Sequence, residues 1–237
     1  MLKEALQYLV SLKANQTYEI HGETYSDHEL TRIEKHIDRP TSIEVNGLDS
    51  IVKLVKSEVG KTPTPIFIRV RSPRSVHVFG TLDQQMDRSY LYSATCDAPD
   101  FKEGWRNHES AIIELRSAFV QNEGTAYLLD LLSRISKEDG VTSEDNGVSQ
   151  TVSARQGISL KNYERVKNRV KLIPYRTFTE IEQPESEFLL RLDENTQVGL
   201  FGADGGKWKL DAKERIKTYF EENLKELVES GAVIVMM

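Results

Sequence analysis

The segment Gly202–Lys209, Gly-Ala-Asp-Gly-Gly-Lys-Trp-Lys, carries residue types that a phosphate-binding loop uses. Such a loop needs a glycine, four residues and then Gly-Lys-Ser/Thr, because the hydroxyl ligates magnesium. Here the spacing from Gly202 to Gly206 is one residue short, and Trp208 stands where the hydroxyl is required. We therefore expect no nucleotide hydrolysis by this segment.

The adjacent glycines Gly205 and Gly206 are better explained as a turn. Glycine tolerates positive φ, so the pair can connect a strand ending at Phe201 to a helix beginning at Asp211. The dinucleotide-binding pattern G-x-G-x-x-G is absent from the chain. The sequence therefore predicts no cofactor.

Acidic side chains cluster in the segment Thr-Glu-Ile-Glu-Gln-Pro-Glu-Ser-Glu, residues 179–187. In a strand, alternation would place Glu180 and Glu182 on one face. A metal-dependent nuclease would need such a pair with a lysine nearby, but the next strand carries Arg191. A nuclease is therefore a weak alternative to solvated glutamates. The five histidines are scattered and Cys96 has no base near it in sequence, so we expect neither catalytic nor metal-ligating residues.

A basic segment, residues 161–171, is the strongest binding feature. Cations along a groove and an aromatic ring that stacks on a base are what single-stranded nucleic acid requires. The alternative is an ordinary solvated surface, which the net charge of −6 favours, since phosphate neutralisation supplies most non-specific affinity. The residues that would bind nucleic acid are Arg71, Lys161, Tyr163, Arg165, Lys167 and Arg169.

The composition indicates a soluble globular protein. The chain has 237 residues, of which 38% are hydrophobic and 29% charged, enough to bury a core. No apolar run approaches the roughly 20 residues that span a bilayer, and the first residues do not have the pattern of a signal peptide. A single cysteine suits a reducing compartment. We expect a cytoplasmic protein without membrane contact.

Hydrophobic periodicity predicts an α+β fold, with mainly antiparallel strands and flanking amphipathic helices. Alternating patterns over residues 65–80 and 186–202 each contain a short polar turn, which is typical of antiparallel hairpins.

The sequence also suggests a division of the chain. Residues 1–60 are predicted to form an N-terminal helical region, with helices over 2–12, 27–37 and 47–59. Residues 61–237 are predicted to form the α+β core domain. Within it, the polar residues 136–150 indicate an exposed loop.

The last six residues, Ala-Val-Ile-Val-Met-Met, carry no charged side chain. If exposed, they would be an aggregation hazard, so we expect them to be covered by the protein's own sheet or by a neighbouring subunit. The terminal helices offer more apolar surface than one sheet face needs. We therefore expect a homo-oligomer, with Val233, Ile234 and Val235 as contact residues.

Four segments carry a family resemblance: ATCDAPDFKEGW, DNGVSQTVSARQGI, LIPYRTFTEIEQPESEFLLRL and FGADGGKWKLDA. Together they resemble the YfdQ-like proteins, a family encoded by bacteriophages and prophages. The resemblance covers residues 60–225 and includes no catalytic motif. It implies a phage gene product in the cytoplasm of the infected bacterial host, often encoded near replication and recombination genes. It supplies no established site residues.

Two classes of function are compatible with these features. The first is a non-enzymatic phage accessory protein that self-assembles and acts by binding a host or phage factor, for example to counter a host defence. The second is a single-stranded nucleic-acid-binding accessory of phage replication or recombination. Strongly salt-dependent binding to single-stranded DNA would favour the second.

Overall fold

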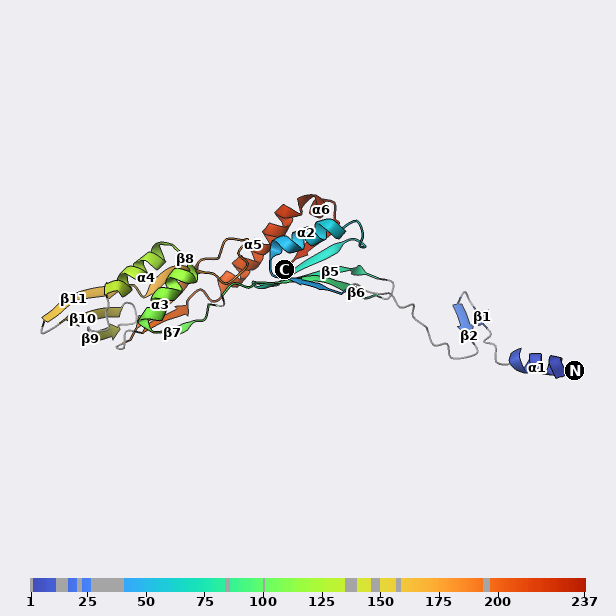
Figure 1. The fold of residues 1–237 in the computed structure, drawn as a ribbon, viewed down its shortest axis with the longest axis horizontal. Coiled ribbons are helices and arrows are strands. Elements are labelled where there is room, and N and C mark those ends of the chain that lie inside the picture. The colour runs from blue at the N-terminus through green and yellow to red at the C-terminus, as the bar shows by residue number, and fades with distance from the viewer. Residues whose placement is uncertain are drawn as a thin grey trace. The chain divides into compact units, whose positions relative to one another are not determined.

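The computed structural model divides the chain into two units, residues 1–39 and 40–237 (Figure 1). It describes residues 2–11, 17–20, 23–26, 41–83, 86–99, 101–134, 140–145, 150–156, 159–193 and 197–237.

The first unit contains a helix and a hairpin. Helix α1 spans Leu2–Ser11, and strands β1 (Thr17–Ile20) and β2 (Glu23–Ser26) pair antiparallel. The helix predicted over 2–12 is therefore confirmed. The helix predicted over 27–37 lies outside the described residues.

The boundary between the units lies at residue 39/40 rather than at residue 60/61. Helix α2, Leu48–Glu58, forms where the sequence predicts a helix, but it belongs to the second unit. Its buried side chains Leu48, Ile51 and Val55 lie in the core of that unit. Amphipathic spacing identified the helix but did not identify the sheet that it covers.

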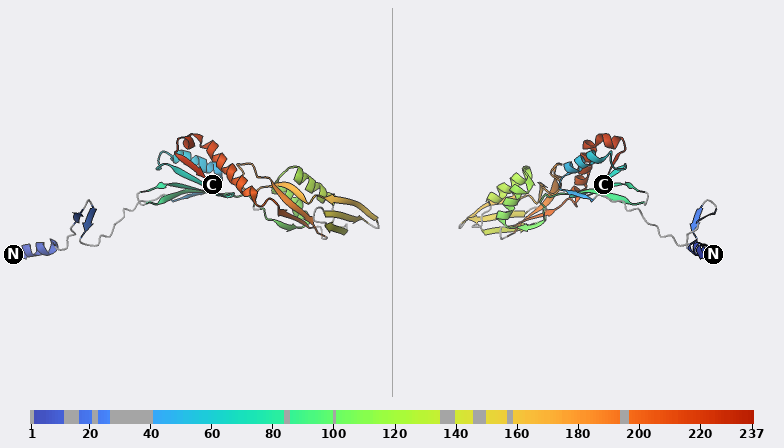
Figure 2. Two further views of the ribbon diagram at one scale, coloured as in Figure 1. Left: turned by 180° about the vertical axis from the view of Figure 1, so that it is seen from behind. Right: turned by 45° about the vertical axis from the view of Figure 1, so that its right-hand side comes forward.

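The first sheet of the second unit has the order β15-β4-β5-β6-β3. Its strands are β3 (Ile43–Val45), β4 (Ile66–Ser72), β5 (Ser75–Leu82), β6 (Arg88–Thr95) and β15 (Val233–Met236). The central pairs are antiparallel, whereas β15 is parallel to β4 and β3 is parallel to β6. Helices α2, α5 (Lys207–Asn223) and α6 (Lys225–Glu229) lie on one side of this sheet (Figure 2).

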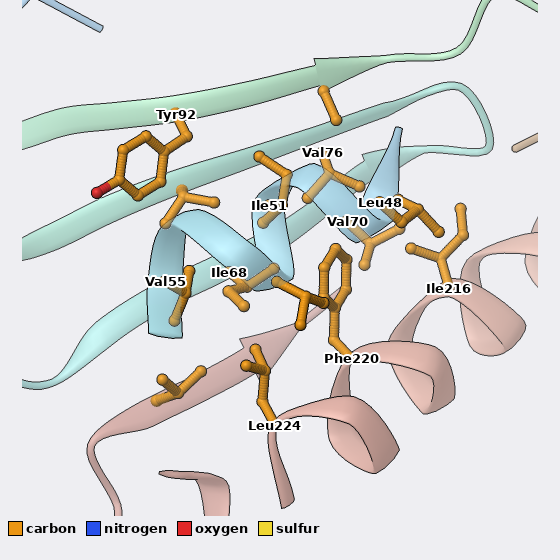
Figure 3. Packing of buried hydrophobic residues seen from close by; sticks show 14 of the residues in the cluster. Leu48, Ile51, Val55, Ile68, Val70, Val76, Tyr92, Ile216, Phe220 and Leu224 are labelled. Atoms are coloured by element: carbon orange, nitrogen blue, oxygen red, sulfur yellow. The ribbon is translucent and has the colours of Figure 1, made fainter. Parts of the chain in front are cut away.

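Alternation along the strands builds the first core. Ile68 and Val70 of β4 and Val76 of β5 point toward the helices, where Ile216 and Phe220 of α5 meet them (Figure 3). Burying side chains of this size contributes about 1.5–3 kcal/mol each.

The second sheet has the order β7-β14-β13-β12-β8 and is antiparallel. Its strands are β7 (Gly104–Arg106), β8 (Phe119–Val120), β12 (Arg169–Pro174), β13 (Ser186–Leu192) and β14 (Val198–Gly202). Helices α3 (His108–Ser117) and α4 (Glu123–Arg134) contribute to its separate core, which includes Leu115, Leu128 and Leu190.

A third sheet occupies part of the segment predicted to be a loop. Strands β9 (Gly140–Asp145), β10 (Gln150–Gln156) and β11 (Ser159–Val166) pair antiparallel in the order β11-β10-β9. The loop predicted over 136–150 is therefore wrong over Gly140–Asp145 and at Gln150, and 136–139 and 146–149 lie outside the described residues. Polar strands pair through the backbone and carry no apolar alternation that a sequence pattern could reveal.

The α+β class is confirmed, because helices accompany mainly antiparallel sheets. Both predicted hairpins form, as β4–β5 and β13–β14.

Candidate nucleic-acid interface

The first sheet has a face that no described helix of the second unit covers (Figure 2). Ile66, Ile68 and Val70 are buried, so alternation along β4 turns the side chains between them to the opposite face. Those side chains are Phe67 and Arg69. Arg71 follows Val70 at an irregularity in the β4–β5 register, and it lies close enough to His77 for its charge to lower the pKa of that imidazole.

Aromatic rings from three strands meet on this face. Phe67 is paired with Phe79 in the β4–β5 register, and the Phe79 and Tyr90 ring centroids are 5.4 Å apart. The ring of His77 lies 5.4 Å from that of Tyr90 in an edge-to-face arrangement. All four rings are partly exposed. They therefore form a continuous but accessible aromatic surface.

Arginines surround the aromatic rings. Arg69 and Arg71 are exposed, and no carboxylate among the described residues forms an ion pair with either. Arg88 reaches across β5, donating to the Gly80 carbonyl oxygen at 3.2 Å and placing its guanidinium 4.5 Å from the centroid of the Phe67 ring. An acidic residue, Glu44, lies at the opposite edge, paired with Ser93.

The pKa of His77 is shifted by its surroundings on this face. Burial lowers the pKa of His77, and the positive charges of Arg71 and Arg69 lower it further. The imidazole is therefore neutral at pH 7. Its Nε2 lies 3.2 Å from Ser75 Oγ, within hydrogen-bonding distance. Both arginines therefore lie near the ring of His77 on this surface.

We call this surface the open sheet face. It consists of Phe67, Arg69, Arg71, His77, Phe79, Arg88 and Tyr90. Aromatic and guanidinium planes can stack on unpaired bases, and the arginines can contact phosphates.

The residues predicted from sequence to bind nucleic acid do not form one site. Arg71 lies on the open sheet face. Lys161, Tyr163 and Arg165 lie on β11, and their side chains are outside the described part of the structure.

The remaining predicted residues have partners in the second half of the chain. Lys167 Nζ lies 5.0 Å from the centroid of the Tyr127 ring, and Arg169 donates to Glu187 at 2.8 Å. A neighbouring carboxylate thus already offsets the charge of Arg169. Arg71 was predicted from the sequence, but the alternation that places the side chain of Phe67 beside the arginines in the predicted hairpin was missed.

The glycine pair forms the predicted turn. Gly205 and Gly206 have φ values of 63° and 81°, but α5 begins at Lys207, so the helix start predicted at Asp211 is wrong. The first helical turn forms earlier because Asp204 satisfies its backbone, accepting from Gly206 N at 2.9 Å.

Asp204 also makes this turn unsuitable for phosphate. Burial raises the pKa of Asp204, but hydrogen bonds from Ser186 Oγ and the backbone N–H groups of Gly206 and Trp208, together with the charge of Arg176, outweigh it and lower the pKa overall. The ionised carboxylate occupies the position at the helix N-terminus where a phosphate would bind.

A cleft of about 730 Å³ adjoins this turn. Arg176, with 5% exposure, forms part of its wall and stacks 3.8 Å from the centroid of the Trp208 ring. It also donates to Ser186 Oγ, while its Nε has no hydrogen-bond partner among the residues that the structure describes. Burial lowers the pKa of Arg176 to about 10, so the side chain stays charged at neutral pH. The stack and the hydrogen bond hold α5 against β13.

The glutamates considered for a nuclease have other partners. Glu180 and Glu182 lie in the turn between β12 and β13 rather than on a strand, so the face predicted for them does not exist. Glu180 Oε1 accepts from Leu48 N at 2.6 Å and caps α2, and Glu182 pairs with Arg215 at 3.0 Å. Within the described ranges, no three His, Cys, Asp or Glu side chains are grouped to hold a metal ion.

The residues predicted for subunit contact lie on β15, which pairs with β4 of the same chain. Val233 is buried in its own core, Val235 is partly buried and Ile234 is exposed. One edge of β15 is therefore covered by strand β4 of the same chain.

Comparison with models of known protein families, with curated proteins and with solved structures finds no significant match. Among the described residues, no helix is long and apolar enough to cross a membrane.

Proposed function

We propose that the chain is a non-enzymatic binding protein that uses the open sheet face to bind single-stranded nucleic acid. The observation that carries this proposal is the grouping of partly exposed aromatic rings with Arg69, Arg71 and Arg88 on one uncovered sheet face.

The geometry favours single strands over duplexes. Rings that lie on a sheet can stack only on bases whose own stacking partners have been removed, and a duplex keeps its bases stacked. The net charge of −6 does not prevent binding, because arginines without local carboxylate partners set the potential at this face.

The family resemblance suggests a setting for this activity. A phage protein encoded near replication and recombination genes would meet single-stranded DNA in the cytoplasm of the infected host. This setting is an implication of the resemblance and is part of the proposal.

Affinity measurements on labelled oligothymidine test the proposal. An oligomer of about 16 nucleotides covers the upper range of sites on sheet-based binding folds. Base stacking contributes about 1–3 kcal/mol per aromatic side chain, so Phe79→Ala or Tyr90→Ala should weaken binding about 5- to 150-fold. Tyr90→Phe keeps the ring and should bind like the wild type.

Salt dependence tests the arginines separately. Each phosphate contact with a single strand contributes about −0.7 to the slope of log affinity against log salt. Arg69→Ala and Arg71→Ala should each reduce the slope by about that amount. Arg169→Ala, whose charge Glu187 offsets, and Lys53→Ala, at an exposed position of α2, serve as matched controls. The proposal fails if the aromatic variants bind like the wild type, or if duplex binds as tightly as single strand.

The other expected function, a self-assembling protein that binds a host or phage factor, is a second candidate. The exposed apolar side chains of Ile234 and Met236 beside the open sheet face support self-association. A protein partner would be favoured if oligothymidine does not bind and a protein is retained by the wild type but not by Phe79→Ala.

A further inference from the structure

Strand β15 has one edge without a partner strand among the described residues. It is the outermost strand in the order β15-β4-β5-β6-β3. Proteins usually protect such an edge with a charge, a proline or a bulge. The residues Val233–Met236 include neither a charge nor a proline, and their register with β4 is regular.

The backbone of β15 has N–H and C=O groups that can hydrogen-bond to a second partner strand. Ile66 N donates to the Ala232 carbonyl oxygen at 2.9 Å, so Ala232 faces β4. Because successive residues of a strand direct their backbone groups to opposite sides, Val233 and Val235 direct their N–H and C=O groups to the free edge. Ile234 and Met236 lie beside Phe67 and Arg69 in the register and have 40% and 37% exposure.

We propose that β15 pairs antiparallel with β15 of a second copy of this chain. An identical strand without charge offers the same hydrogen-bonding edge and brings no like charges together. In a two-fold antiparallel pair, one residue lies directly opposite its own copy, and the axis passes between the two. At the centre of β15 that residue is either Ile234 or Val235.

This pairing extends the proposed nucleic-acid site and rests on that function. An antiparallel two-fold pair is related by an axis perpendicular to the sheet, which keeps both open sheet faces on the same side. The first sheets of the two copies then form one continuous sheet. A single strand of nucleic acid can cross from the aromatic rings of one copy to those of the other, so the second copy completes the site.

Light scattering of the full chain without nucleic acid tests the pairing. The wild type should be a dimer at micromolar concentration, and the double variant Ile234→Lys/Met236→Lys should be a monomer, because like charges then meet across the axis. Ile113→Lys on α3, which replaces an apolar side chain with 60% exposure elsewhere, should remain a dimer. A monomeric wild type, or a dimeric double variant, overturns the pairing.

Crosslinking tests the pairing of β15 without a variant that destabilises the dimer. The native Cys96 is buried, so a short thiol crosslinker should join copies only through an introduced cysteine. Either Ile234→Cys or Val235→Cys should yield a covalent dimer, depending on which residue lies at the axis, and Ile113→Cys should not. If neither β15 variant crosslinks, the pairing is overturned.

DNA binding separates this inference from the proposed function. The added lysines of the double variant should strengthen phosphate contacts in a monomer. If the second copy completes the site, the double variant should nevertheless bind long oligothymidine at least tenfold more weakly than the wild type does, while short oligomers lose nothing. Unchanged affinity for long oligomers would overturn the shared site. A wild-type dimer that binds no oligothymidine would overturn the proposed function but leave the pairing intact.

Discussion

Replacing Gly124 with alanine should displace α4 from the strand beneath it. A Cβ atom at this position would lie 2.0 Å from the Lys171 carbonyl oxygen and 3.2 Å from Leu172 Cδ2. Ordinary contact begins at 3.4 Å, so the helix or the strand would have to move by about 1.4 Å.

Neither element can move freely. The Lys171 carbonyl oxygen accepts from Asn122 Nδ2 at 3.1 Å, and Lys171 is also held in the β12–β13 register opposite Glu187. Asn122 in turn caps α4: its Oδ1 accepts from Thr125 N at 2.9 Å, and its own N–H donates to Thr125 Oγ1 at 2.8 Å. A shift at Gly124 would therefore disturb the cap.

The free-energy cost of the Gly124→Ala substitution should exceed its gain in helix propensity. Alanine gains up to about 1 kcal/mol over glycine within a helix, whereas overpacking costs about 1–3 kcal/mol and a lost hydrogen bond about 1 kcal/mol more. We expect a net loss of about 1–3 kcal/mol. In a domain of this size, each kcal/mol lowers Tm by about 2–4 °C.

Thermal unfolding of the purified chain is the assay, with Gly60→Ala as the matched control. No atom lies within 4 Å of a Cβ at Gly60, so that substitution should leave Tm unchanged or raise it by reducing the entropy of the unfolded chain. If Gly124→Ala melts at or above the wild-type temperature, the close packing of α4 on β12 is refuted.

Two further predictions concern carboxylates with defined partners. Glu180→Ala should lower the free energy of unfolding by about 1 kcal/mol by removing the cap of α2, whereas Glu182→Ala, whose ion pair is solvent-exposed, should change it by less than about 0.5 kcal/mol in the same urea titration. Because the folded pKa of Asp204 is lowered, its stabilisation is present above the unfolded pKa of about 3.9 and is lost as the pH falls through the folded pKa. Asp204→Asn should therefore be less stable than the wild type at pH 7, with a gap that narrows toward pH 2, and a constant gap would contradict this role.

Strong apolar periodicity was enough to predict much of the fold. Helix α2 and the two hairpins have clear helical or alternating patterns, and each forms where expected. Strand β9 was missed because its residues, Gly140–Asp145, are mostly polar and form a strand through backbone pairing with β10. The start of α5 was misplaced because Asp204, outside the helix, satisfies its first N–H groups.

The candidate site was harder to predict because its residues are not consecutive. The sequence drew attention to a run of cations, but pairing with β13 gives Arg169 a carboxylate partner. The open sheet face combines residues of three strands, and Arg88 joins it by donating to the Gly80 carbonyl oxygen and placing its guanidinium over the ring of Phe67. Similarly, the cap of α2 by Glu180 joins residues 132 positions apart, and no local pattern indicates it.

The two cores of the second unit differ in how they can be completed during synthesis. The second core uses residues between Ala111 and Leu200, a single stretch of chain. The first core combines α2, β4, β5 and β6 from before that stretch with Phe220 and Val233 from after it, and takes Phe178 from within it. The second core can therefore form on the ribosome as a nested insertion. Strands β4, β5 and β6 of the first core lack α5 and β15 until those later elements have been synthesised. Until β15 emerges, the edge of β4 that it covers remains unpaired, so the nascent chain is most exposed to aggregation after β4 has folded and before β15 has been made.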